Sequence, residues 1–440
     1  MIRQEDLEVE KLAEGRLPSP IALPSARAGR KGHFVSDSSR VRFEVKSSES
    51  DDLSFEEAGP REKVFFKPEE TTAAIVTCGG LAPGLNNVIR SVYHELVDNY
   101  GVKRVLGIRN GYKGLNPQFG LKPINLTEDY VDSIDMLGGT VLGSSRGPQE
   151  VSVMADFLES QQIDILFCLG GDGTQRGAYN LHQEINRRKR PIAIVGIPKT
   201  IDNDVPYVQM SFGFTTALEK AAEVIRGIHV EARGVINGVG LVKLMGRNAG
   251  FIAAGASVIS QEVDFTLVPE VPFPLEGENG FLSALEDRLR RRAHAVIVVA
   301  EGAGQHLFNQ TETERDASGN IRHQDIGVLL RERIKEHFHN VNITANVRYV
   351  DPSYSIRSVP ANAYDRFLSD QMARHAAHAA MAGKTGMLVG SMHGLFINIP
   401  IPVVVAGEKK VEVEGDLWRA VLTSTRQPHW SYLQGIDHET

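Results

Sequence analysis

The strongest constraint on the fold is an apolar run that ends in a glycine-rich turn. Residues 163–169 are apolar except for Asp164, and Gly170-Gly171-Asp172-Gly173-Thr174 follows directly. A short apolar run stopped by glycines is typical of a strand buried in a parallel sheet, and such sheets bind ligands beyond the carboxyl ends of their strands. Glycines let the backbone approach a phosphate closely, and Asp172 supplies a carboxylate of the kind that holds Mg²⁺.

A second apolar run, residues 192–197, ends in Pro198-Lys199-Thr200-Ile201-Asp202-Asn203-Asp204. Because parallel strands end at the same edge of a sheet, we expect the two turns to form adjacent loops. Asp202 or Asp204 then offers a base near a reacting hydroxyl, although both are also usual residues for capping a turn. The two loops together favour phosphoryl transfer.

The rest of the chain alternates strand and helix patterns around further polar turns, which predicts an α/β fold with mainly parallel sheets. Residues 73–77 read as a strand that leads into Cys78-Gly79-Gly80-Leu81-Ala82-Pro83-Gly84 and then into a helix. Residues 324–338 are expected to form a helix and residues 342–350 a strand. Residues 362–382 predict a long helix that ends at Gly383.

Three motifs invite other interpretations. Gly143-Ser144-Ser145-Arg146-Gly147 matches a hydrolase nucleophile pattern, but Pro148 follows at once and no clean strand precedes it. We therefore expect a backbone clamp that presents Arg146 to a phosphate. Gly383-Lys384-Thr385 resembles the end of a P-loop, yet it follows a helix and is interpreted as a helix stop. His375 and His378, with His337 and His339, lack a third zinc ligand at a recognised spacing, so solvated helix faces are expected.

Charge and composition narrow the function classes. The net charge of −7 comes with interspersed signs and no basic patch for nucleic acid. The sequence contains no run of about 18 apolar residues, so we expect no membrane span. Only two cysteines occur, Cys78 and Cys168, which favours a reducing compartment and a cytoplasmic location.

Residues 1–70 differ in composition from the rest of the chain. They contain Pro18, Pro20 and Pro24, a basic stretch at 27–31 and a polar stretch at 47–52. We expect a solvated tail or an arm that wraps a neighbouring subunit, with one short strand near residues 41–45.

Read together and in this order, four motifs resemble those of the 6-phosphofructokinases over roughly residues 72–390. They are Gly79-Gly80 with Pro83-Gly84-Leu85-Asn86, Gly170 to Thr174, Pro198 to Asp204, and Met245-Gly246-Arg247. The resemblance implies two doubly wound, Rossmann-like lobes with the active site in the cleft between them. It implies an N-terminal extension at 1–70, a nucleotide lobe at 71–213 with a return segment at about 357–440, and a fructose 6-phosphate lobe at 214–356.

The same resemblance implies the chemistry and its residues. Asp202 would accept the proton of the sugar 1-hydroxyl, Asp172 would coordinate Mg²⁺, and Arg146, Arg247 and Thr200 would assist catalysis. Nucleotide contacts would come from Gly80, Tyr112, Arg146, Gly147, Gly171, Asp172, Gly173 and Thr174. Sugar contacts would come from Thr200, Ile201, Asp202, Met245, Gly246, Arg247, Glu301, Arg348, Tyr354, Ser355, Ile356 and Arg357, with Arg348 reaching across a subunit interface.

Departures from the common bacterial pattern bear on the phosphoryl donor. Lys199 resembles the residue that pyrophosphate-dependent relatives have at this position. Gly173, in contrast, leaves room for a nucleotide α-phosphate, which an aspartate would repel. This combination resembles the ATP-dependent group of plants, trypanosomatids and some bacteria, with Tyr354 in place of the usual sugar-site histidine and Gly238 in place of an interface arginine. ATP is therefore the expected donor. An allosteric homotetramer or homodimer is the expected assembly.

Three alternatives remain. They are a pyrophosphate-dependent enzyme, another kinase with a Gly-Gly-Asp-Gly-Thr loop, and a catalytically silent regulatory subunit.

Overall fold

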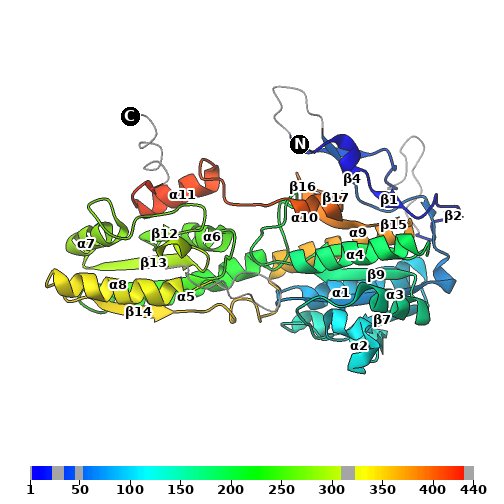
Figure 1. Ribbon diagram of the computed structural model, residues 1–440, viewed down its shortest axis with the longest axis horizontal. Helices are drawn as coiled ribbons and strands as arrows, with labels where there is room; N and C mark the ends of the chain where they lie inside the picture. The colour runs from blue at the N-terminus through cyan, green and yellow to red at the C-terminus, as the bar shows by residue number, and fades with distance from the viewer. Residues whose placement is uncertain (1, 22–33, 45–52, 309–322, 431–440) are drawn as a thin grey trace. The chain divides into compact units, whose positions relative to one another are not determined.

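Two mainly parallel sheets, each in its own unit, organise the chain (Figure 1). The computed structural model describes residues 2–21, 34–44, 53–308 and 323–430. The first unit comprises Met1–Thr200, Val205–Gly213 and Ser358–Glu408, and the second comprises Ile201–Asp204, Phe214–Arg357 and Lys409–Thr440. Within the described residues, no helix is long and apolar enough to cross a membrane.

The sheet of the first unit has the strand order β3-β4-β17-β16-β10-β9-β6-β7-β8. Its central strands run parallel: β16 (Met387–Met392), β10 (Ala193–Pro198), β9 (Ile165–Gly170), β6 (Thr72–Thr77) and β7 (Arg104–Ile108). Antiparallel strands flank them: β17 (Leu395–Pro400), β4 (Ser54–Glu57), β3 (Arg40–Arg42) and β8 (Ile124–Asn125). Strand β7 lies on one side of β6 and β9 on the other, so the strand order reverses at β6, the usual place for a ligand crevice.

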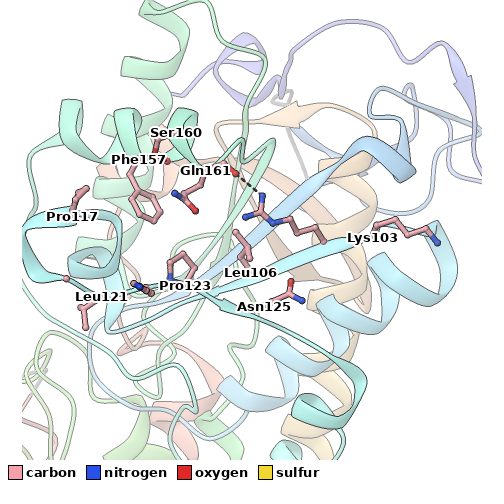
Figure 2. Close-up of a pocket in the computed structure, with 12 residues that line it drawn as sticks. Lys103, Leu106, Pro117, Leu121, Pro123, Asn125, Phe157, Ser160 and Gln161 are labelled. Atoms are coloured by element: carbon pink, nitrogen blue, oxygen red, sulfur yellow. Dashed lines mark hydrogen bonds between the residues drawn. The ribbon is translucent and has the colours of Figure 1, made fainter.

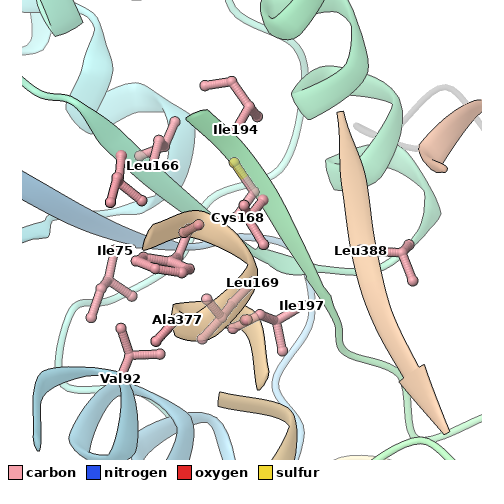
Figure 3. Packing of buried hydrophobic residues seen from close by; sticks show 14 of the residues in the cluster. Ile75, Val92, Leu166, Cys168, Leu169, Ile194, Ile197, Ala377 and Leu388 are labelled. Atoms are coloured by element: carbon pink, nitrogen blue, oxygen red, sulfur yellow. The ribbon is translucent and has the colours of Figure 1, made fainter. Parts of the chain in front are cut away.

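Helices cover both faces of this sheet. Helix α1 (Leu85–His94) packs on α9 (Ala363–Met381), and α3 (Val151–Ser160) packs on α4 (Asp172–Arg187). The crossover through α1 runs from β6 to β7, and the crossover through α4 runs from β9 to β10, in the opposite direction along the sheet. Because such crossovers are right-handed, the two helix pairs lie on opposite faces. Figure 3 shows Val92 of α1 and Ala377 of α9 near Ile75, Leu169 and Ile197 of the strands. Shorter helices are α2 (Glu128–Val131) and α10 (Ile401–Ala406).

The boundaries predicted for the long helix α9 are confirmed. The side chain of Asn362 caps α9 by accepting a hydrogen bond from the Asp365 amide, and Gly383 follows the helix with φ +79°. Only glycine adopts that conformation without strain, so the helix ends there. Lys384–Thr385 then form strand β15, which confirms that the Gly-Lys-Thr triplet is a helix stop.

The described part of residues 1–70 is built into the first unit. Strands β3 and β4 extend the large sheet, β1 (Glu10–Lys11) pairs with β15, and β2 (Leu17–Pro18) pairs with β5 (Lys63–Val64). The strand expected near 41–45 is β3 at Arg40–Arg42. The stretches 27–31 and 47–52 lie outside the described residues.

The sheet of the second unit has the order β12-β13-β11-β14, and all its strands are parallel. Its strands are β11 (Gly238–Leu244), β12 (Phe265–Leu267), β13 (His294–Ala300) and β14 (Asn346–Val350). Helices α5 (Phe214–Arg233) and α6 (Phe251–Ser260) pack together, as do α7 (Phe281–Arg292) and α8 (Ile326–Asn340), while α11 (Asp416–Thr425) packs on α6. Two helix-covered, mainly parallel sheets confirm the predicted fold class.

The expectation of solvated histidines is wrong for two of the four. His378 of α9 is buried, and its ring contacts the Tyr100 hydroxyl at 3.0 Å. Burial lowers the pKa of His378 to about 3 and that of His375, which stacks on Phe396, to about 4. Both rings lie on the covered side of α9, which its sequence pattern did not reveal. Among the described residues, no group of three or more His, Cys, Asp or Glu side chains could hold a metal ion.

Candidate active site

One candidate cluster of functional residues is formed by loops of the first unit, at the carboxyl ends of β6, β9 and β10. Pro198 pairs with Gly170 across β10 and β9, and Thr77 pairs with Leu169 across β6 and β9. The glycine turn after residue 77, the turn at 170–174 and Lys199 therefore emerge at one edge of the sheet. The adjacency predicted from the two apolar runs is confirmed.

The turn at 170–174 runs directly into a helix. Gly171 is the N-cap of α4, and Asp172 is its first residue. A Cβ on Gly170 would lie 2.1 Å from the Thr174 hydroxyl oxygen, so only glycine allows this turn to close. The first amides of a helix lack intrahelical acceptors and carry partial positive charge, which makes the turn suited to a phosphate. The Asp172 side chain is 65% exposed and accepts a hydrogen bond from Arg176 at 3.0 Å.

The loop that carries Arg146 is bound to the first glycine turn. The Gly79 amide donates to the Ser145 carbonyl at 3.0 Å, the Ser144 hydroxyl donates to the Gly79 carbonyl at 2.7 Å, and the Thr77 hydroxyl donates to the Gly143 carbonyl at 2.7 Å. These bonds place Arg146 and Gly147 beside the first glycine turn, which contains Gly80. Arg146 is exposed, and Gly147 has a φ of +91°. Presentation of Arg146 to a phosphate stays a prediction.

Lys199 and Tyr112 lie close to the glycine turns. A Cβ on Gly79 would be 3.4 Å from Lys199 Nζ, and the Lys199 amide donates to the Gly170 carbonyl at 3.1 Å. Tyr112 is buried, and its hydroxyl donates to the Thr174 carbonyl at 2.7 Å. Burial raises the pKa of Tyr112, so the phenol stays a neutral donor. Tyr112 therefore supports the first turn of α4 from within the core.

Another candidate cluster lies in the second unit, at the carboxyl ends of β11 and β13. Leu244 pairs with Ala300, and the Glu301 amide donates to the Leu244 carbonyl at 2.9 Å. A Cβ on Gly302 would lie 1.9 Å from the Arg247 carbonyl oxygen, so the two loops are in tight contact. Arg247 and Glu301 are thereby brought together, as their positions after two strands predict.

Glu301 lies among cations. Burial raises the pKa of Glu301, while the charges of Lys243, Arg247 and Arg357 oppose that rise. The guanidinium of Arg357 lies 5.1 Å from the ring centre of Tyr354. This cluster of one acid and three bases can bind a polyol that carries a phosphate.

Tyr354 and Arg357 belong to the loop at 351–357, which is attached to the core of the second unit by one buried residue. Ile356 is fully buried, and the Ser355 hydroxyl donates to the Pro352 carbonyl at 2.8 Å. Tyr354 is 75% exposed. Arg348 is exposed on β14, at the edge of the four-stranded sheet.

Two residues near Glu301 were missed from the sequence. Lys243 of β11 forms ion pairs with Asp325 at 2.8 Å and Asp351 at 2.9 Å, which join the ends of β11, α8 and β14. A lone lysine in an apolar strand was the available signal. Burial and the charge of Arg247 lower the pKa of His323, which lies against the Glu301 backbone, and no sequence pattern pointed to it.

The two carboxylates of residues 201–204 differ in their surroundings. The Asp202 Oδ1 atom is shielded from solvent, and Ile201 is buried. Asp204 lies close enough to Lys409 for its charge to act on that ammonium group. The spacing of these two acids left open which of them is the base. The structure shows that their surroundings differ.

A glycine stands at 238 for a local reason. A Cβ there would lie 2.0 Å from the Ala232 carbonyl oxygen, at the tight link between α5 and β11. An arginine at this position would force the backbone apart.

A hollow of about 850 Å³ lies elsewhere in the first unit (Figure 2). It is lined near the start of β7 by Lys103, Arg104, Leu106 and Phe157, and Arg104 donates to the Gln161 carbonyl at 3.0 Å. None of the residues predicted for the site lines it. The cleft expected between the lobes stays a prediction.

Comparison with known proteins agrees with these motifs. The family model described as Phosphofructokinase matches residues 72–380. The chain is 45% identical to an ATP-dependent 6-phosphofructokinase of Borreliella burgdorferi, covering 96% of this chain and 97% of that protein. It is 43% identical to an ATP-dependent 6-phosphofructokinase of Trypanosoma brucei brucei, covering 96% and 87%. A solved pyrophosphate-dependent phosphofructokinase from Marinobacter aquaeolei has a TM-score of 0.66 at 22% identity, covering 81% and 91%, which shows similarity of fold alone.

Proposed function

The chain belongs to the phosphofructokinase family, and from this premise we propose that it transfers the γ-phosphoryl group of ATP to the 1-hydroxyl of fructose 6-phosphate. The observation that carries the proposal is the similarity, at 45% and 43% identity over 96% of this chain, to two proteins named ATP-dependent 6-phosphofructokinase. The polar loops of both units supply the groups that this reaction needs.

The first unit would bind the nucleotide. Backbone amides of Gly80 and of the turn at 171–174 would hold the phosphates, because glycines and a helix start leave donors facing an anion. Arg146 would stabilise the negative charge that spreads over the transferred group. Tyr112 would act indirectly, by fixing the Thr174 carbonyl at 2.7 Å.

Asp172 fits the part of Mg²⁺ ligand. Its carboxylate is 65% exposed at the start of α4, where the helix amides favour a neighbouring phosphate. Mg²⁺ is commonly bound by one or two carboxylates together with substrate phosphates and water, so a single acid suffices. When bound, the ion neutralises charge on the β- and γ-phosphates.

The second unit would bind the sugar phosphate. Glu301 would accept hydrogen bonds from sugar hydroxyls, and Arg247, Arg357 and Arg348 would bind hydroxyl or phosphate oxygens. Met245, Gly246, Tyr354, Ser355 and Ile356 would shape the pocket. Asp202 would accept the proton of the 1-hydroxyl as its oxygen attacks the γ-phosphorus atom, with Thr200 and Ile201 beside it.

A pyrophosphate donor is the second candidate, because Lys199 resembles the residue of pyrophosphate-dependent enzymes. The open space at Gly173, where an added Cβ meets nothing within 4 Å, favours ATP. The cytoplasmic location, the oligomeric state and allosteric control stay predictions.

The test is an assay of the purified protein with fructose 6-phosphate and either ATP or pyrophosphate. We expect turnover with ATP and Mg²⁺ and at least a hundredfold lower kcat/KM with pyrophosphate. Preference for pyrophosphate would contradict the donor. Binding of both substrates without turnover would instead identify a silent regulatory subunit.

A further inference from the structure

The segment that follows Glu408 contacts the substrate side of the second unit. The Val411 amide donates to a carboxylate oxygen of Glu270 at 2.8 Å. The same carboxylate accepts from the Gly250 amide at 2.9 and 3.1 Å, and Gly250 is the N-cap of α6. Because Gly250 follows Arg247 closely in the chain, this carboxylate fastens residues 409–411 next to the Met-Gly-Arg loop.

Lys409 lies half-buried in this region. Its Nζ lies 5.2 Å from the ring centre of Phe251, the first residue of α6. Burial lowers the pKa of Lys409 to about 8, although the charge of Asp204 acts in the opposite direction. An enclosed cation is stabilised by an aromatic face and by a nearby carboxylate.

The charge on Asp204 matters because Asp202 is its near neighbour. Two carboxylates that lie near each other repel. A cation at Asp204 offsets that repulsion and ties the loop to a fixed point in the same unit.

We propose that Lys409 is a positioning residue: by pairing with Asp204 it holds the 201–204 loop so that Asp202 can accept the proton from the substrate. The inference deepens the proposed function and rests on it, since it takes Asp202 as the base. Lys409 itself acts through Asp204 and contacts no reacting atom. A misplacement of about 1 Å at a reacting group can cost about a hundredfold in rate, which sets the size of the expected effect.

The experiment compares Lys409→Met, Lys409→Arg and the matched control Lys410→Met, which removes the adjacent, exposed lysine. We expect Lys409→Met to lower kcat about 10- to 100-fold while KM for fructose 6-phosphate and for ATP changes less than threefold. Lys409→Arg should recover most of kcat, and Lys410→Met should equal wild type. Circular dichroism and thermal melting verify that each variant folds.

Two further readouts separate positioning from a general loss of stability. In a double-mutant cycle, Asp204→Asn with Lys409→Met should be no slower than Asp204→Asn alone, because both changes remove the same pair. The wild-type kcat should fall as pH rises past about 8, where Lys409 loses its proton. Lys409→Arg should not show this fall, because guanidinium stays protonated.

The outcomes distinguish this inference from the proposed function. An active wild type with Lys409→Met at wild-type kcat, or with additive effects in the cycle, would overturn the inference alone. An inactive wild type would overturn the proposed function and this inference with it.

Discussion

The glycines at 173 and 238 have opposite surroundings: Gly173 is open and Gly238 is crowded. An added Cβ at Gly173 meets nothing within 4 Å, whereas at Gly238 it would lie 2.0 Å from a backbone carbonyl oxygen. Substitution at 173 therefore leaves the fold unstrained and changes only what can bind there. Substitution at 238 would disturb folding. The presence of glycine there therefore gives no information about subunit contacts.

Gly173→Asp should change donor preference. The new carboxylate would repel the α-phosphate of ATP, whereas pyrophosphate has no group at that place. We expect kcat/KM for ATP to fall at least tenfold and the ratio of pyrophosphate to ATP activity to rise. Gly173→Asn is the control of equal size without charge. Equal losses in both variants would mean that space, not charge, decides the donor.

Asp202→Asn should lower kcat by about a hundred- to ten-thousandfold, the range for loss of a general base. Binding of both substrates, measured by calorimetry, should change little because the amide has nearly the same shape. Asp98→Asn, at an exposed carboxylate, serves as the control. A near-normal kcat would remove Asp202 from the role of base.

Glu301 should make sugar binding depend on pH. Burial raises its pKa above the ordinary value for a glutamate, so it gains a proton at a higher pH than most carboxylates do. A protonated Glu301 loses the charge that faces Arg247 and Arg357. We expect KM for fructose 6-phosphate to rise as pH falls toward that raised pKa.

The Glu301→Gln variant separates this effect from titration of the substrate phosphate. Its KM should be higher than that of wild type at neutral pH, and the difference between the two proteins should shrink as pH falls. Glu336→Gln, at an exposed glutamate, should follow wild type. Parallel pH profiles for wild type and Glu301→Gln would contradict the assignment.

At the scale of elements, a buried ionic cluster ties residues 1–70 to the large sheet. Lys384 of β15 is fully buried and lies 2.6 Å from Glu56 of β4, which also pairs with Arg61 at 2.8 Å. Asp37 contacts Lys384 at 3.2 Å. Strand β15, which pairs with β1 in a separate two-stranded sheet, is thereby joined to β4 of the large sheet through side chains.

Lys384→Met should destabilise the first unit by about 3–5 kcal/mol, because it leaves buried carboxylates without their cation. The measurement is the free energy of unfolding in urea. Lys103→Met, at an exposed lysine, should change it by less than about 0.5 kcal/mol. A loss below about 1 kcal/mol would show that the cluster contributes little.

At the scale of the whole molecule, the two proposed half-sites lie almost entirely in separate units. The glycine turns, Arg146 and Lys199 belong to the first unit, and residues 202, 247, 301 and 357 belong to the second. Each unit has its own sheet and its own loops at strand ends. Binding of the two substrates should therefore be separable by mutation.

Gly173→Asp should weaken ATP binding and leave the Kd for fructose 6-phosphate within about twofold of wild type, and Glu301→Gln should do the reverse. Calorimetric titration with one ligand at a time measures this directly. Ligand-induced shifts in Tm should follow the same division, because each ligand stabilises the protein in proportion to its binding. Loss of both affinities in either variant would contradict the division.

Local features of the sequence were sufficient for the central strands of the large sheet and for the turns that follow them. Apolar runs stopped by glycine mark where β6, β9 and β10 end, and parallel strands present those ends at one edge. The helix stop at Gly383 follows equally from local geometry, since only glycine tolerates the backbone conformation needed there.

Other features depend on contacts between residues far apart in the chain. Burial of His378 depends on Tyr100, the supporting place of Tyr112 depends on Thr174, and the difference between Asp202 and Asp204 depends on Lys409. No local pattern encodes such pairs, because burial and electrostatic partners arise only when distant segments pack. The places of the loops could thus be foreseen from residue types and spacing, whereas the burial and the partners of individual acids and bases follow from the folded arrangement.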